Sequence, residues 1–195
     1  MTIVVLMGPP GAGKGTHADH LAGRLGVPVI STGDIFRAQV AARTELGRTA
    51  QRYLDAGEYV PDEVTNAMVR ERLAADDTRL GFLLDGYPRT VDQAAVLDEI
   101  LAAQDRSLAA AVVLQVDPEV LVHRLLRRAE IEHRSDDTEV VIRRRFQVYD
   151  DETSPLITSY AARGIHYEID ASADIDTVRV RVHEVADLLG VAAQR

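Results

Sequence analysis

The stretch LMGPPGAGKGTH, from Leu6 to His17, follows a short apolar run and precedes a helical pattern. Glycine has no Cβ, so a backbone rich in glycine can turn with positive φ and aim successive N–H groups into one concavity. The helix that follows adds the partial positive charge of its N-terminus. A strand, a glycine loop and a helix in this order predict an α/β fold with a phosphate-binding loop.

Lys14 lies inside this loop and is the only lysine, because the other 21 of the 22 basic residues are arginines. A lysine ammonium is a compact cation on a flexible stem, whereas the planar fork of arginine fits a narrow loop poorly. Gly8, Gly13 and Lys14 match the general pattern GxxxxGK followed by Ser or Thr. Gly15 stands at the Ser/Thr position, and Thr16 comes one residue later. A glycine-rich turn without a ligand is the alternative, and the retained lysine favours phosphate binding.

Composition narrows the class of protein. The 195 residues suffice for one compact domain, and the net charge of −9 argues against broad binding of nucleic acid or an anionic membrane. The absence of cysteine excludes disulfides and thiolate metal sites. No apolar run is long enough to span a bilayer, and the start MTIVVLMG lacks the basic region of a signal peptide. We expect a cytoplasmic protein whose partners are small molecules.

Short apolar runs alternate with helical patterns along the chain. The predicted strands are TIVVLM (2–7), PVIS (28–31), GFLLD (81–85), AAVVLQV (110–116) and IHYEI (165–169). The last helical pattern places five apolar residues on one face: Ile175, Val178, Val182, Val185 and Leu189. Near-continuous apolar strands separated by helices predict a five-stranded parallel sheet with helices on both faces, a three-layer fold. Ligands of such sheets bind at the carboxyl ends of the strands.

The stretch from Thr32 to Leu80 is longer than one crossover between strands needs. It has a helical pattern throughout, broken near Glu45–Gly47 and Gly57–Pro61. A helical insert of this length is either decoration or a lid over the substrate.

Four further motifs join the glycine loop: STGDIFR (31–37), LDAGEYVPDE (54–63), LLDGYPRTVDQA (83–94) and RSDDTEVVIRRRF (134–146). In this order and spacing the chain resembles the adenylate kinase family of P-loop nucleoside monophosphate kinases, over essentially its whole length. The resemblance implies a P-loop NTPase-like fold with three parts: a core of residues 1–30, 61–126 and 138–195, an AMP-binding insert of residues 31–60, and a short lid of residues 127–137.

The resemblance also implies the residues of each site. The ATP-binding set is Gly11, Ala12, Gly13, Lys14, Gly15, Thr16, Arg124, Arg128 and, through its backbone, Ala173. The AMP-binding set is Thr32, Arg37, Glu58, Tyr59, Val60, Gly86, Tyr87, Pro88, Arg89, Gln93, Arg134 and Arg145. The catalytic set is Lys14, Arg89, Arg124, Arg128, Arg134 and Arg145. An arginine fork matches two phosphate oxygens, and the amide of Gln93 can address the edge of adenine.

A metal is implied at the end of the third predicted strand. Asp85 is expected to hold Mg²⁺ through water beside the phosphates, and Asp34 is similarly placed. An ordinary Asp-Gly turn is the alternative for Asp85. We expect no zinc, because the chain has no cysteine and only His133 lies near the short lid. His17 and His20 sit one helical turn apart and are expected to be exposed.

Seven of the 21 arginines fall between Arg124 and Arg145. Two nucleotides brought together in a dry site need such dense positive charge. Three of the seven are expected on solvated faces instead, paired with acidic neighbours. These are Arg127, Arg143 and Arg144, with Glu130, Glu132 and the acidic stretch DDTE (136–139) as partners.

The implied activity is reversible, Mg²⁺-dependent transfer from ATP to AMP, giving two ADP and balancing the adenine nucleotides. The family expectation is a monomer whose partners are ATP, AMP and ADP. A kinase for UMP or CMP is an alternative, although such relatives usually differ at Thr32 and Gln93. A nucleotide-binding regulator that transfers nothing is an alternative from another class, but it could lose acceptor-side residues that this chain retains.

Overall fold

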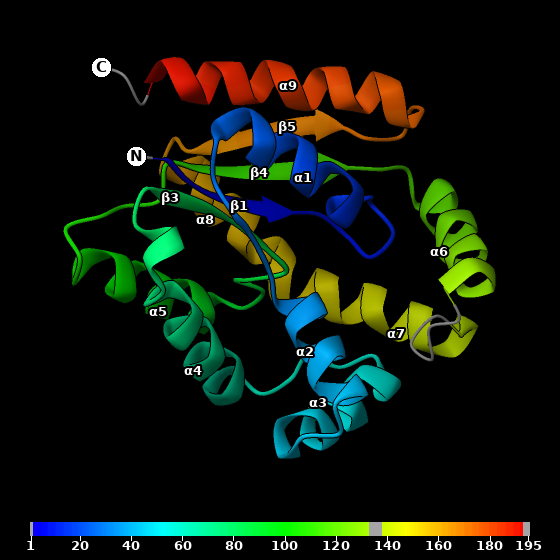
Figure 1. Ribbon diagram of the computed structural model, residues 1–195. Helices are drawn as coiled ribbons and strands as arrows, with labels where there is room; N and C mark the ends of the chain where they lie inside the picture. Colours follow the sequence, from blue (N-terminus) through cyan, green and yellow to red (C-terminus); the bar gives the residue numbers. More distant parts are fainter. Residues whose placement is uncertain (1, 133–137, 193–195) are drawn as a thin grey trace.

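The computed structural model describes residues 2–132 and 138–192, which contain a five-stranded sheet (Figure 1). The strands are β1 (Thr2–Met7), β2 (Val29–Ser31), β3 (Gly81–Asp85), β4 (Ala110–Gln115) and β5 (His166–Asp170). Their order is β2-β3-β1-β4-β5, and every neighbouring pair is parallel. The α/β class, the parallel sheet and all five predicted strands are confirmed, the strand ends to within one residue.

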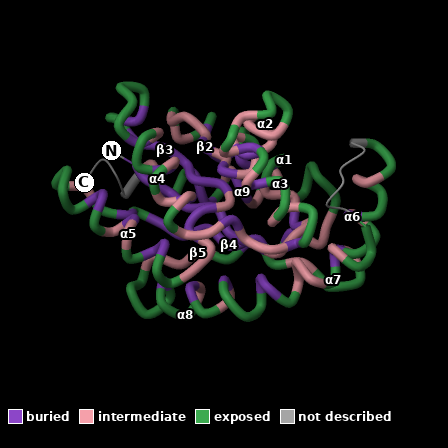
Figure 2. Tube along the Cα trace, turned by 90° about the horizontal axis from the view of Figure 1, so that it is seen from below, coloured by how far each residue is buried: buried purple, intermediate pink, exposed green. Residues whose placement is uncertain are grey.

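Both faces of the sheet are covered, which explains the near-continuous apolar runs. Ile3 and Val5 of β1 pack into one core, and Val4 and Leu6 pack into the core on the opposite face. Successive side chains of a strand point to opposite faces, so a strand between two helical layers needs apolar residues at every position. Figure 2 shows the strands buried at the centre and the outer helices largely exposed.

Helices form the two outer layers of the sandwich (Figure 1). One face of the sheet carries α1 (Lys14–Leu25) and α9 (Ile175–Ala192), and the other carries α4 (Asp62–Leu73), α5 (Val91–Ala102) and α8 (Ser154–Ala162). In α9 the predicted buried face is confirmed except at Ile175, which is 60% exposed. Ile175 is the first residue of α9, and it lines a cavity at the edge of the sheet instead of packing into the core. No helix within the described ranges is long and apolar enough to cross a membrane.

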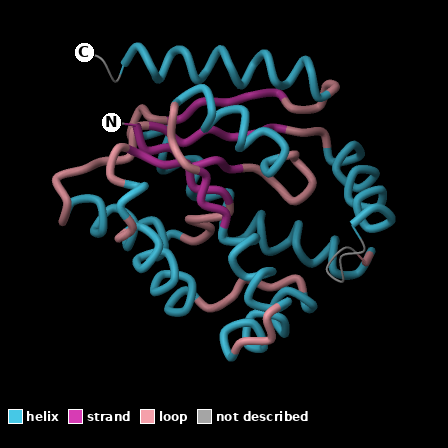
Figure 3. The backbone as a smooth tube through the Cα atoms, in the orientation of Figure 1, coloured by secondary structure: helices cyan, strands magenta, loops and turns pink. Residues whose placement is uncertain are grey.

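Most of the remaining elements extend from the carboxyl edge of the sheet, whereas the 3₁₀ turn that comes shortly before β3 lies at the amino edge. They are α2 (Thr32–Ala41), α3 (Glu45–Ala56), the 3₁₀ turn η1 (Asp76–Thr78), α6 (Pro118–Glu132), α7 (Glu139–Val148) and the π-helical turn η2 (Tyr149–Thr153). The long insert is helical, with short connections, as Figure 3 shows. Its first break falls just before the predicted position, because the Thr44 side chain caps α3 by accepting from the N–H of Gly47 at 3.0 Å.

Helices α2 and α3 approach each other closely at Gly47. A Cβ added to this glycine would lie 2.0 Å from the Gln39 carbonyl oxygen and 2.3 Å from its carbon, both backbone atoms. We therefore expect Gly47→Ala to reduce the free energy of unfolding by about 1–3 kcal/mol through overpacking. Thermal unfolding measures the loss.

Gly23→Ala is the matched control for this substitution. Gly23 lies inside α1, and a Cβ there would have no neighbour within 4 Å. Alanine is the better helix former, so this variant should gain up to about 1 kcal/mol. Equal stability of the two variants would contradict the close packing of α2 on α3.

Candidate active site

Two adjoining cavities open where the predicted ligand edge of the sheet lies, beside the residues that follow β1, β2, β3 and β5. The first lies beside α2 and the loop after α3, and the second lies between the glycine loop, α6 and the start of α9. Four cationic side chains line both cavities: Lys14, Arg37, Arg89 and Arg145. No acidic residue is among the described residues that line both. The junction of the cavities is therefore strongly cationic and suited to anionic oxygens.

The glycine loop wraps around the Lys14 ammonium. Gly13, the N-cap of α1, has φ 89°, a left-handed conformation that glycine adopts without strain. Lys14 Nζ donates to the carbonyl oxygens of Gly8 at 2.7 Å and Pro9 at 3.0 Å. No side chain of the described residues caps the N-terminus of α1, and the first residues of this helix line the second cavity. This is the geometry of a phosphate-binding loop with its cation already in place.

Burial and neighbouring cations make Lys14 unusually acidic. Burial is the largest cause that lowers the pKa of Lys14, and with the opposing carboxylate of Asp85 and the charges of Arg89, Arg145 and Arg128 the resulting pKa is about 8. The positive charge is thus costly in the ligand-free site. A bound phosphate would relieve that cost.

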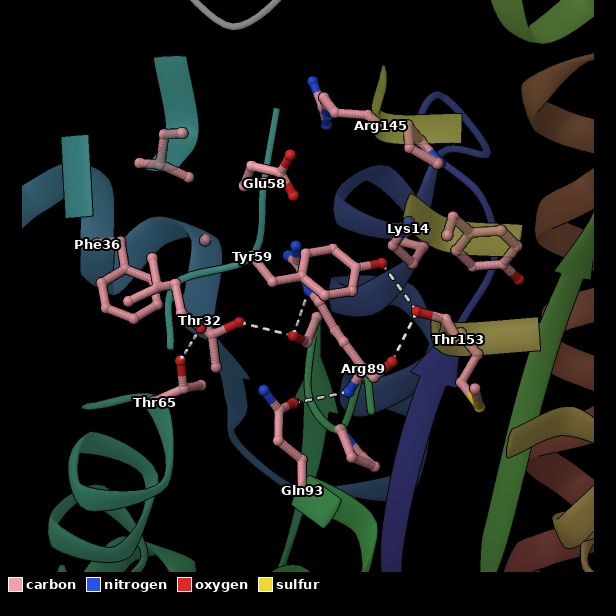
Figure 4. A pocket seen from close by; sticks show the side chains of 18 of the residues that line it. Lys14, Thr32, Phe36, Glu58, Tyr59, Thr65, Arg89, Gln93, Arg145 and Thr153 are labelled. Atoms are coloured by element: carbon pink, nitrogen blue, oxygen red, sulfur yellow. Dashed lines mark hydrogen bonds between the residues drawn. The ribbon is translucent and has the colours of Figure 1, made fainter. Parts of the chain in front are cut away.

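The first cavity presents a fixed set of polar groups (Figure 4). Thr32 Oγ1 donates to the Gly86 carbonyl at 2.9 Å. Gln93 Oε1 accepts from the backbone N–H of Arg89 at 2.8 Å, while its Nε2 donates to Asp62 Oδ1 at 2.6 Å. These two partners determine which way the amide of Gln93 points. The first cavity is thus lined both by the oriented amide of Gln93 and by the four cationic side chains, which suit a phosphate.

Asp85 fits a magnesium ion held through water. It ends β3 and is 8% exposed, and its Oδ1 is buried with no hydrogen-bond partner among the described residues. A buried carboxylate oxygen without a partner is costly unless a cation or water meets it. Asp34 is more exposed and accepts a hydrogen bond from Arg37, so its role at a metal stays a prediction. Within residues 2–132 and 138–192, no three His, Cys, Asp or Glu side chains are grouped to hold a metal ion.

Arg124 links α6 to the loop after β5. Its Nη1 donates to the Ala171 carbonyl at 2.9 Å and its Nη2 to the Ala173 carbonyl at 3.1 Å. Both Arg124 and Ala173 line the second cavity, together with Arg128. The Ala173 carbonyl therefore already accepts a hydrogen bond from Arg124, and a role of its backbone at a ligand stays a prediction. Arg134 lies outside the described residues.

The cavities gather nearly all the predicted site residues. Every described member of the ATP-binding set lines the second cavity except Ala12, which is buried in the core with its N–H bonded to the Pro9 carbonyl at 3.1 Å. Every described member of the AMP-binding set lines the first cavity except Tyr87. Tyr87 is 1% exposed, and its hydroxyl donates to Asn66 Oδ1 at 2.7 Å and lies 3.1 Å from the Gln93 carbonyl oxygen. Tyr87 thus lies behind the residues that line the first cavity and contacts the backbone of Gln93.

Two further predictions are wrong in part. Arg143 pairs with Glu139 as expected, but Arg144 pairs with Glu58 of the insert at 2.6 Å, because α7 lies against the loop after α3. His17 is 4% exposed and lines the second cavity, because its ring packs beside the glycine loop, 3.4 Å from where a Cβ of Gly13 would lie. Burial lowers the pKa of His17.

Several lining residues carry no motif that would have marked them. In the first cavity these are Thr65, Tyr149 and Thr153, and in the second they include Leu125, Ile131, Asp174 and Val178. Tyr149 and Thr153 belong to the π-helical turn η2. Such turns are frequent at functional sites, but an ordinary helical pattern in the sequence does not reveal them.

The chain matches known proteins over most of its length. The family model described as adenylate kinase matches residues 6–165. An adenylate kinase of Kocuria rhizophila is 55% identical over 182 residues, which cover 93% of this chain and 97% of the relative. One of Thermobifida fusca is 55% identical over 178 residues, covering 91% and 94%. One of a Nocardioides species is 52% identical over 186 residues, covering 95% and 97%. With the site geometry and these matches together, the chain belongs to the adenylate kinase family.

Proposed function

We propose that this chain transfers a phosphoryl group reversibly from ATP to AMP, with Mg²⁺, and gives two ADP. The junction of two cavities at Lys14, Arg37, Arg89 and Arg145 is the observation that carries the proposal. In this arrangement the second cavity takes ATP and the first takes AMP, so their phosphates meet among the four cations.

Positioning and charge stabilisation supply the catalysis. The acceptor is a phosphate oxygen that is already anionic at neutral pH, so no general base is required. Lys14, Arg89 and Arg145 stabilise the charge of the transferring group, and the cavity walls align donor and acceptor. Bound Mg²⁺ would neutralise charge on the phosphates, with Asp85 holding it through water.

We further propose the division that the family resemblance implies, into a core, an AMP-binding insert of residues 31–60 and a lid of residues 127–137. Closing the insert and the lid would expel water, which otherwise competes as acceptor for the phosphoryl group. We also propose that the protein is a cytoplasmic monomer. Size-exclusion chromatography with light scattering tests the monomer.

Chromatographic analysis of products tests the reaction itself. The chain is incubated with ATP and Mg²⁺ together with AMP, UMP, CMP or GMP in parallel. We expect ADP with AMP alone, and ATP plus AMP from ADP alone. Transfer to UMP or CMP would favour the pyrimidine kinase alternative, and ATP binding without transfer to any acceptor would favour the regulator.

The lowered pKa of Lys14 predicts that ATP binding weakens at high pH. Phosphate oxygens favour the charged lysine, so its pKa rises on binding from about 8 in the free site. Above that pH the Lys14 ammonium of the free site loses its proton. The dissociation constant of ATP should then increase by about tenfold per pH unit, until Lys14 in the ATP complex also loses its proton. Calorimetric titration between pH 7 and 9.5 measures this slope, which should vanish in Lys14→Met.

The same shift acts on stability with the opposite sign. The unfolded lysine titrates near 10.5, so the unfolded chain binds more protons than the folded one between about pH 8 and 10.5. In that window the contribution of Lys14 to the free energy of unfolding rises with pH. In the binding titration, a dissociation constant of ATP that does not change between pH 7 and 9.5 would contradict the lowered pKa of Lys14.

A further inference from the structure

Tyr59 lies against Arg89 at the wall of the first cavity (Figure 4). It belongs to the loop that joins α3 to α4, and its side chain is half-buried. The guanidinium carbon of Arg89 lies 4.9 Å from the centroid of the Tyr59 ring. This is a cation–π contact, in which the negative face of the ring attracts the guanidinium.

The hydroxyl of Tyr59 reaches the same arginine by a second route. Tyr59 Oη lies 2.8 Å from Thr153 Oγ1, and Thr153 Oγ1 donates to the Arg89 carbonyl at 2.8 Å. A hydroxyl has one proton. Since Thr153 donates that proton to the Arg89 carbonyl, it accepts a hydrogen bond from the Tyr59 hydroxyl. Tyr59 therefore holds Arg89 at its guanidinium directly and at its backbone through Thr153.

Arg89 needs such support because it lies among other cations. Its Nε donates to the Gly86 carbonyl at 2.7 Å, and no carboxylate among the described residues forms an ion pair with it. Lys14 and Arg145 line the same junction and repel its charge. A carboxylate would hold the guanidinium but compete with a phosphate for it, whereas an aromatic face attracts the cation and leaves its N–H groups for an anion.

The contact also joins two parts of the fold that are far apart in sequence. Tyr59 comes from the insert, while Thr153 comes from the π-helical turn η2, 94 residues later. The neighbouring pair of Glu58 with Arg144 of α7 ties the same loop to the same side of the molecule. The Tyr59 hydrogen bond therefore forms only where the insert lies against η2.

We propose that Tyr59 is a positioning residue that orients Arg89 toward the AMP phosphate when the insert closes. The inference rests on the proposed function of the first cavity as the AMP site. Tyr59 acts through Arg89 and makes no bond in the reaction. The ring of Tyr59 sets the direction of the Arg89 guanidinium. The hydroxyl of Tyr59 bonds to Thr153 only when the insert lies against η2.

Two substitutions separate the ring from the hydroxyl in the full chain. Tyr59→Phe keeps the ring and loses the bond to Thr153, so kcat/KM for AMP should fall about threefold to tenfold. Tyr59→Leu loses both contacts, and kcat/KM for AMP should fall about thirtyfold to a hundredfold. The KM for ATP should change less than twofold in both variants. Tyr167→Phe, in β5 and away from both cavities, is the matched control for hydroxyl loss and should change neither constant.

A double-mutant cycle distinguishes orientation of Arg89 from simple filling of the insert. If Tyr59 acts through Arg89, adding Tyr59→Leu to Arg89→Ala should lower kcat/KM for AMP less than twofold further. The full loss of Tyr59→Leu in both backgrounds would overturn the proposal. So would a Tyr59→Leu variant with wild-type AMP dependence.

The cycle is also measured as AMP affinity by calorimetric titration. Wild-type chain that binds AMP without transferring phosphate would overturn the proposed reaction, while coupling of the two residues in AMP binding would still support the role of Tyr59. Wild-type chain that transfers phosphate while the two substitutions act additively would overturn the role of Tyr59 alone. Failure of the wild-type chain to bind AMP would overturn both.

Discussion

Lys14→Met is expected to lower kcat for phosphoryl transfer by about 10³-fold to 10⁴-fold while the chain stays folded. The Lys14 ammonium is held by the carbonyl oxygens of Gly8 and Pro9 at the junction of the two cavities. From there it can follow the transferring group, and methionine keeps the length of the side chain but loses its charge. Coupled-enzyme assays of ADP formation at saturating ATP and AMP measure the loss.

Stability is the control that separates this effect from misfolding. The charge of Lys14 is costly in the folded ligand-free chain, as its lowered pKa indicates, so Lys14→Met should unfold at the same temperature or higher. Lys14→Arg keeps the charge but has a planar fork, and it should remain nearly inactive. Arg143→Met removes a cation from an exposed pair with Glu139 and should keep near-normal turnover. Near-normal turnover of Lys14→Met would contradict the proposed mechanism.

The features that the sequence predicted well are those that a local pattern determines. A strand buried on both faces needs apolar residues at every position, so its ends coincide with the ends of the apolar run. The glycine loop owes its shape to backbone conformations that glycine alone adopts freely, and these appear directly in the sequence. The motifs around Thr32 and Gln93 each follow a strand and so arrive at the same edge of the sheet.

The features that escaped prediction depend on contacts between distant segments. His17 lies on a polar stretch of α1, yet the loop that precedes the helix buries it. Arg144 has acidic neighbours in sequence, but the approach of α7 to the insert gives it Glu58 as partner. The link between Tyr59 and Thr153 needs both the insert and a π-helical turn, and neither position is informative alone. Local pattern and the resemblance to the adenylate kinase family thus predicted most of the residues that line the site, but not the contacts that hold these residues in place.

Arg89→Ala is expected to lower kcat/KM for AMP by about 10²-fold to 10³-fold and to change the affinity for ATP little. Arg89 follows β3, is anchored through Nε to Gly86, and lines both cavities without an ion-pair partner among the described residues. Its two remaining guanidinium nitrogens are therefore available to grip a phosphate with two hydrogen bonds, the strongest form of such recognition. Initial rates over a range of AMP concentrations at saturating ATP measure the effect.

Arg37→Ala is the matched comparison for this substitution. Arg37 also lines both cavities, but it is 39% exposed and already pairs with Asp34, so part of its charge is neutralised and solvated. We expect its removal to lower kcat/KM for AMP about tenfold, clearly less than the loss of Arg89. An AMP dependence unchanged by Arg89→Ala would remove Arg89 from the site. Equal losses for the two arginines would mean that the ion pair of Arg37 with Asp34 does not decide which cation binds the phosphate of AMP.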